Sequence, residues 1–124
     1  MRITCICLVI LLSVVCANIG SVSAADIEGT YSAQGTNPGG KGEYTGSVII
    51  SKTKDTYKIV WSVGGVYIGT GIIVDGTLSV TYVDESSKSS GLVVYKILEN
   101  GKKLEGVWCA YNGTELGKET LEKK

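Results

Sequence analysis

The aromatic side chains are the residues of this chain with the clearest capacity for ligand chemistry. There are seven Tyr, two Trp and no Phe, so every ring carries a polar group. Such rings offer a stacking surface and a hydrogen-bonding atom together, which suits a sugar, a small amphiphile or an anchor patch for a protein partner. The candidate ligand-binding or partner-binding aromatics are Tyr31, Tyr44, Tyr57, Trp61, Tyr67, Tyr82 and Trp108.

The residue types on which most enzymes and metal sites depend are scarce. The chain has no His, which removes the Ser-His-Asp and Cys-His nucleophilic arrangements and the usual zinc sites. A glycosidase would need two carboxylates facing each other in a cleft. The acidic residues on or near the expected strands instead have neighbours typical of a solvated outer face, and they are Glu28, Glu43, Glu105, Glu115 and Glu119. We therefore expect no enzyme activity, no metal and no cofactor.

The amino-terminal segment has the pattern of an export signal. A basic start precedes an apolar run over residues 3–15, and Val22-Ser23-Ala24 has the small-x-small form that signal peptidase accepts. We predict a signal peptide over residues 1–24 and a single domain over residues 25–124, which would be periplasmic or secreted and would have no membrane span after cleavage. Two alternatives stay open: an uncleaved anchor, although the run is shorter than the ~20 residues of a spanning helix, and a lipoprotein acylated at Cys16.

Cleavage would leave one cysteine and little net charge. Cys109 would be the only Cys of the mature chain, so its thiol is either a small packed hydrophobe or the site of an intermolecular disulfide. The mature part has 11 Lys against 12 acidic residues and no Arg, so its formal charge is −1. This balance argues against nucleic-acid binding.

Short segments rich in Val, Ile, Thr, Tyr and Trp alternate with turn signals along the rest of the chain, and no stretch has a helical period. Gly-containing dipeptides such as Asp75-Gly76 and Asn112-Gly113 favour tight hairpins between neighbours. The expected strands are Ile27–Gln34, Gly42–Ser51, Thr56–Val63, Val66–Val74, Thr77–Val83, Gly91–Leu98, Lys103–Tyr111 and Thr114–Leu121.

These strands predict an all-β, eight-stranded antiparallel up-and-down meander barrel. Short connections leave no room for parallel crossovers, and closing the sheet removes two long exposed edges. A two-sheet β-sandwich is the alternative. Alternation places Ile59, Trp61 and Val80 inside, whereas the inward face of Val66–Val74 is undecided.

A short sequence near the start recurs near the end. Residues 28–33 read EGTYSA and residues 105–110 read EGVWCA. Because the first and last strands of a ring meet, we expect Tyr31 and Trp108 to lie close together and to plug one end. Glycines inside the strands either allow close backbone approach or leave space for a ligand.

Two resemblances follow from these motifs. The Gly29-x-Tyr31 opening resembles the Gly-x-Trp opening of calycins such as lipocalins and avidins, although the mature chain has no Arg to stack on that ring. The chain is also similar to small exported bacterial proteins often labelled fibronectin-binding. The motifs of that second resemblance are Gly35-Thr36-Asn37-Pro38-Gly39-Gly40, Tyr44-Thr45-Gly46, Tyr57-x-Ile59-x-Trp61, Tyr67-x-Gly69-Thr70-Gly71-Ile72 and Gly117-x-Glu119-Thr120-Leu121.

The expected function is a non-catalytic binding or interaction module. Its partner would be a protein or an envelope or extracellular-matrix component, and the second resemblance implies an adhesin-like role. One alternative is a carrier of a small amphiphilic ligand with a Tyr- and Trp-lined interior, and another is a protease-inhibitor-like barrel. A void of a few hundred Å³ lined by these rings would favour the carrier, because ligand pockets start near ~300 Å³, whereas a filled interior would leave only surface binding.

Overall fold

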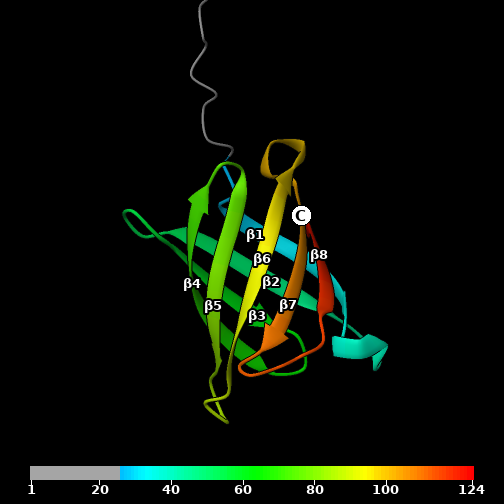
Figure 1. The fold of residues 1–124 in the computed structure, drawn as a ribbon. Helices are drawn as coiled ribbons and strands as arrows, with labels where there is room; N and C mark the ends of the chain where they lie inside the picture. The colour runs from blue at the N-terminus through cyan, green and yellow to red at the C-terminus, as the bar shows by residue number, and fades with distance from the viewer. Residues whose placement is uncertain (1–25) are drawn as a thin grey trace, which may run out of the picture.

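Eight β-strands pair edge to edge in chain order, and the last strand pairs with the first (Figure 1). A computed structural model describes residues 26–124, so the predicted signal peptide and Cys16 lie outside the described residues. Two single-turn 3-10 helices, η1 (Pro38–Gly40) and η2 (Glu99–Gly101), lie in loops. The strands are β1 (Gly29–Thr36), β2 (Glu43–Lys52), β3 (Tyr57–Ser62), β4 (Val66–Val74), β5 (Thr77–Asp84), β6 (Ser90–Leu98), β7 (Lys103–Ala110) and β8 (Gly117–Lys123).

The predicted closed, antiparallel up-and-down barrel is confirmed, and the sandwich alternative is wrong. The largest difference in strand bounds is at β8, which begins at Gly117 rather than at Thr114. Asn112 has a φ of 61° and Gly113 N–H donates to Ala110 O at 2.7 Å. These residues make the first turn of a longer loop over residues 111–116, not a two-residue hairpin. Within residues 26–124 no helix has the length and apolar character needed to cross a membrane.

The two ends of the barrel differ in their connections. We call one end the closed end; it carries the β2–β3, β4–β5 and β6–β7 connections and the residues that precede β1. There Asp75 and Gly76, with φ of 49° and 73°, form the tight β4–β5 hairpin at the top of Figure 1. The opposite end, which we call the open end, carries the loops over residues 37–42, 63–65, 85–89 and 111–116. All four of these open-end loops are longer than the two-residue β4–β5 hairpin connection.

The closed end is filled by fully buried side chains. Ile27, Leu104 and Leu121 have no exposed surface. Tyr31 is equally buried, and its hydroxyl oxygen lies 2.7 Å from the carbonyl oxygens of both Ile27 and Gly101. This contact joins the segment before β1 to the β6–β7 connection and seals the barrel there.

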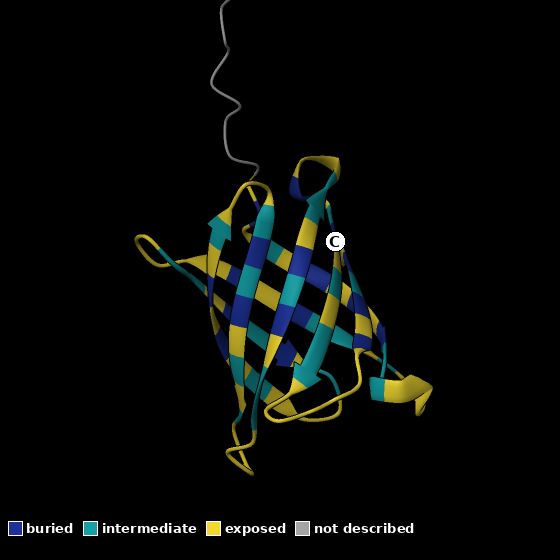
Figure 2. Cartoon of the chain, viewed as in Figure 1, coloured by how far each residue is buried: buried dark blue, intermediate teal, exposed yellow. Residues whose placement is uncertain are grey.

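The inward face follows the predicted alternation, which appears as bands of buried and exposed residues in Figure 2. Ile59, Trp61 and Val80 are buried as expected. On β4 the structure places Gly69 and Gly71 inside, where a Cβ at Gly69 would lie 2.8 Å from Trp61 Cζ3. Neighbouring side chains thus fill the space that these glycines leave.

The expected contact between Tyr31 and Trp108 is wrong. Tyr31 lies near the start of β1 at the closed end, whereas Trp108 lies near the end of β7 and pairs with Gly117 at the open end. Strands β1 and β7 flank β8 and run in the same direction, so equivalent motifs near the start of one and the end of the other are separated along the barrel axis.

Candidate functional site

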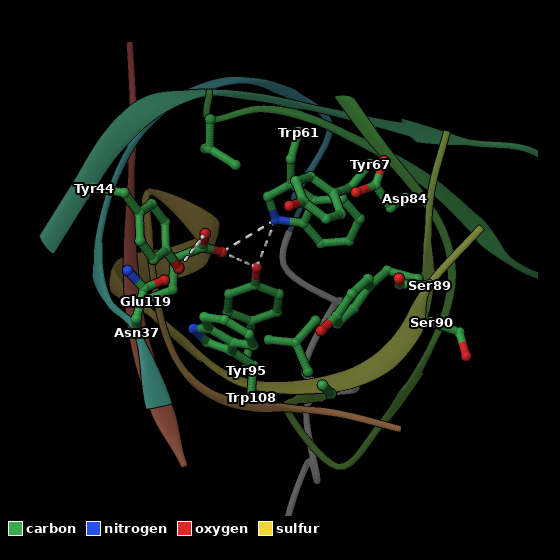
Figure 3. Close-up of a pocket in the computed structure, with 14 residues that line it drawn as sticks. Asn37, Tyr44, Trp61, Tyr67, Asp84, Ser89, Ser90, Tyr95, Trp108 and Glu119 are labelled. Atoms are coloured by element: carbon green, nitrogen blue, oxygen red, sulfur yellow. Dashed lines mark hydrogen bonds between the residues drawn. The ribbon is translucent and has the colours of Figure 1, made fainter. Parts of the chain in front are cut away.

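A cavity of about 410 Å³ lies inside the open end of the barrel (Figure 3). Each strand from β2 to β7 contributes one aromatic ring to its lining, and β8 contributes a carboxylate. In chain order these residues are Tyr44, Trp61, Tyr67, Tyr82, Tyr95, Trp108 and Glu119. The remaining lining residues are apolar Val63, Val93 and Ala110 and polar Asn37, Asp84, Ser89 and Ser90.

Four of the rings lie over a glycine on the adjacent strand. In each case the ring and the glycine are directly opposite each other in the strand register, and a Cβ on the glycine would overlap the ring. The backbone of one strand therefore forms the seat of the ring on the next and fixes its orientation. The pairs are Tyr44 with Gly35, Tyr82 with Gly91, Tyr95 with Gly106 and Trp108 with Gly117.

Tyr82 is the centre of the aromatic wall. Its ring centroid lies 6.1 Å from that of Trp61, 5.8 Å from that of Tyr67 and 6.4 Å from that of Trp108. Tyr44 contacts Trp108 in the same way at 6.2 Å, and all four pairs are edge to face, with interplanar angles of 65–80°. This geometry is favourable for aromatic pairs, because the positive edge of one ring meets the negative face of the other.

Glu119 is a buried carboxylate beside these rings, with 5% of its surface exposed. Its Oε1 accepts a hydrogen bond from the Tyr44 hydroxyl at 3.0 Å. Its Oε2 accepts from Trp61 Nε1 at 3.1 Å and from the Tyr95 hydroxyl. Burial raises the pKa of the Glu119 carboxyl, and the three donors offset that rise only in part.

The hydroxyls of Tyr44, Tyr82 and Tyr95 stay protonated at neutral pH and act as donors. Burial, and next the charge of Cys109, raises the pKa of Tyr82 to about 12. Burial, and next the charge of Glu119, holds the pKa values of Tyr44 and Tyr95 far above the usual range. At the mouth, hydrogen bonds from Ser86 lower the pKa of Asp84.

The charge of the lining is purely negative. Glu119 and Asp84 are its only ionisable groups besides the tyrosines, and no lysine of the described chain lines the cavity. Trp108 Nε1 is a further polar atom in the wall, buried and without a hydrogen-bond partner of normal geometry among residues 26–124. No group of three metal-ligating side chains occurs in that same range.

Five of the seven aromatics singled out from the sequence line the cavity, and their role in binding stays a prediction. The other two lie elsewhere: Tyr31 is sealed in the closed end, and half-buried Tyr57 packs against the core. Sequence reasoning missed Tyr95 and Glu119 as site residues. The assignment of Glu119 to the solvated outer face is wrong, because Gly117, Glu119 and Leu121 alternate inward along β8.

Cys109 faces outward on β7 next to inward Trp108 and is half-buried. It pairs in register with Leu92 of β6, and its carbonyl oxygen accepts a hydrogen bond from the Tyr82 hydroxyl at 3.3 Å. The thiol is free in the described chain, and an intermolecular disulfide stays a prediction.

No protein-family model matches the sequence, and no curated protein is significantly similar to it. The similarity to exported proteins labelled fibronectin-binding thus rests on the quoted motifs alone. What the structure establishes is the all-β, eight-stranded closed barrel and the geometry of its cavity.

Proposed function

We propose that this protein binds a small, largely apolar molecule in the aromatic cavity at the open end of its barrel. The observation that carries the proposal is the lining: six strands in succession each contribute one ring around about 410 Å³. This volume falls in the ~300–1,000 Å³ range of small-molecule sites, which are typically apolar with a few convergent polar groups. Here the Glu119 carboxyl group, held by three hydrogen-bond donors, is such a group.

The site is formed before any ligand arrives. Rings held over glycines and against one another lose little rotamer freedom on binding, which lowers the entropic cost of association. A ligand that buries ~150 Å² of apolar surface would gain about 4 kcal/mol at ~25 cal/mol per Å². This gain suits reversible carriage or sequestration of a small molecule.

The proposed activity is ligand binding without catalysis, by a protein that is exported from the cytoplasm. The amino-terminal pattern predicts export, and no reaction step is assigned to the cavity residues. Among the functions predicted from the sequence it corresponds to the small-ligand carrier, and the closed meander is consistent with a calycin-like barrel.

Intrinsic fluorescence offers a direct test, because the only two Trp of the chain, Trp61 and Trp108, both line the cavity. Titration with phenethyl alcohol, a neutral aromatic probe, should give a saturable change in tryptophan emission. Ala110→Phe narrows the cavity and should weaken this binding. Val107→Phe, on the outer face of the same strand, is the matched control and should not. Binding that Ala110→Phe leaves unchanged, or no saturable signal, would contradict the proposal.

An interaction module for a protein or envelope partner is the second candidate. A row of apolar residues crosses the outer face of β2, β3, β4 and β5, where Ile49 pairs with Val60, Val60 with Ile68 and Ile68 with Val83. Ile49, Ile68 and Val83 are exposed. If this row is the binding surface, Ile68→Asp should abolish partner binding and Ala110→Phe should preserve it, as measured with envelope or matrix fractions.

A further inference from the structure

Glu119 has no positively charged partner among the described residues that line the cavity. Its neighbours Tyr44, Trp61 and Tyr95 donate hydrogen bonds but are themselves uncharged. Neutral donors offset only part of the free energy lost when a carboxylate leaves water, and a positive charge offsets more. The usual partner, a lysine or arginine side chain, is missing from the lining within residues 26–124.

One acceptor position of the carboxylate is also free. The two oxygens of an ionised carboxylate offer about four lone-pair sites. Oε2 accepts two hydrogen bonds, from Trp61 and Tyr95, whereas Oε1 accepts one, from Tyr44. Glu119 lines the cavity, so a donor on a bound molecule can reach the remaining site on Oε1.

The aromatic walls beside Glu119 also favour a positively charged ligand. Aromatic faces carry negative electrostatic potential and attract ammonium groups within about 6 Å, most strongly when both are shielded from water. Six rings surround the cavity, and Asp84 adds a second carboxylate at the mouth. An anionic ligand would meet two negative charges and no positive one.

We infer that the ligand is a small organic cation: a protonated amine that donates to Glu119 Oε1, with its apolar body enclosed by the tyrosine and tryptophan rings. This inference rests on the proposed function for the cavity itself and adds the charge and the orientation of the ligand. Neutral molecules of the same shape fill the same space but leave Glu119 without a counter-ion.

Three probes of similar shape and different charge test the inference. Phenethylamine, phenethyl alcohol and hydrocinnamate share a phenyl ring on a short chain and end in an ammonium, a hydroxyl and a carboxylate. Titrations of the whole mature protein, followed by tryptophan emission, should show the amine binding about tenfold or more tighter than the alcohol, and the carboxylate weakest. Equal affinities, or a tighter alcohol or carboxylate, would overturn the inference and leave the proposed function standing. Failure of all three to bind would overturn both.

Glu119→Gln tests the role of the charge. The variant should lose most of the preference for phenethylamine and retain binding of phenethyl alcohol. Glu122→Gln, an exposed position on the same strand, is the matched control and should keep the preference. A preference that survives Glu119→Gln would overturn the inference.

The pH dependence of the wild type provides the same test if Glu119→Gln fails to fold. The titratable groups that contact Glu119 are the hydroxyls of Tyr44 and Tyr95, and the Tyr82 hydroxyl elsewhere in the wall donates to the Cys109 carbonyl oxygen. The pKa values of all three hydroxyls are raised, so none of them titrates in acid. Asp84 has a lowered pKa and is protonated only at lower pH. As Glu119 protonates on acidification, the amine should lose its advantage while the alcohol binds unchanged. An advantage that is constant through the acid range would overturn the inference.

Discussion

The two ends of this barrel use the same residue types for opposite purposes. At the closed end, Tyr31 directs its hydroxyl to two backbone carbonyl oxygens and packs among Ile27, Leu104 and Leu121, so no space remains. At the open end, Tyr44 and Tyr95 direct their hydroxyls to the Glu119 carboxylate, and their rings border a cavity. Tyr31 therefore stabilises the fold through backbone partners at the closed end, whereas Tyr44 and Tyr95 shape the site by holding a buried carboxyl group.

The largest expected effect separates stability from binding. Leu104→Ala removes a fully buried side chain at the closed end and should lower the free energy of unfolding by about 3 kcal/mol. Chemical denaturation measures this, with the exposed Val107→Ala as control. The affinity of the folded variant for phenethylamine should stay within about twofold of wild type. A large loss of affinity would show that the two ends are not independent.

A smaller loss of stability with a larger loss of binding is expected at the open end. Gly117→Ala introduces a Cβ that overlaps both the Trp108 indole and the Thr36 carbonyl oxygen, so the ring must move away from Gly117 and the β1–β8 pairing must shift. Overpacking of this kind costs about 2 kcal/mol. The displaced ring should also change the tryptophan emission and weaken probe binding. Gly65→Ala is the control because its Cβ would make only ordinary contacts. Unchanged emission in Gly117→Ala would show that the glycine does not position the ring.

Tyr31→Phe sharpens the comparison at the closed end. The substitution keeps the ring and leaves the Ile27 and Gly101 carbonyl oxygens without the hydroxyl donor, which should cost about 1–2 kcal/mol. Ligand affinity should not change. Tyr111→Phe, at an exposed position, controls for loss of a hydroxyl. An effect of Tyr31→Phe on affinity rather than on stability would place Tyr31 in the site.

The smallest expected effect is a pH dependence of stability that belongs to the open end. Because burial raises the pKa of Glu119 above its unfolded value, its contribution to stability is fully present below the unfolded pKa and is lost as pH rises through the folded pKa. Unfolding measured across this range should show wild type losing stability relative to Glu119→Gln as pH increases. Glu122→Gln should follow wild type. A wild type that gains stability relative to Glu119→Gln would reverse the sign of the assigned shift.

The sequence predicts the barrel better than it predicts the site. Period-two alternation and Gly-containing turns determine strands and hairpins locally, and these signals were sufficient for all eight strands. The loop over residues 111–116 was missed because Asn112-Gly113 favours a two-residue hairpin, whereas here it makes only the first turn of a longer loop. The inward face of β4 could not be assigned from the sequence, because apolar residues occur at both odd and even positions of the strand. The packing of Trp61 and Val80 around Gly69 identifies the inward face.

The site residues that escaped prediction depend on contacts between distant strands. In the sequence Glu119 resembles a surface glutamate. Only its spacing of two residues from inward-facing Leu121 on the same strand indicates that Glu119 also faces inward. Its three hydrogen-bond donors come from β2, β3 and β6, so no local sequence pattern predicts that they meet at Glu119. The opposed glycine and aromatic pairs are likewise visible only once the register is known.

Those opposed pairs tie recognition to the correct closure of the sheet. A slip of one residue in any pairing would turn a ring outward and place a side chain where the glycine had been. A barrel with a shifted strand register would then lose its cavity as well as its packing. Ligand binding would therefore report that the strands are paired in the native register.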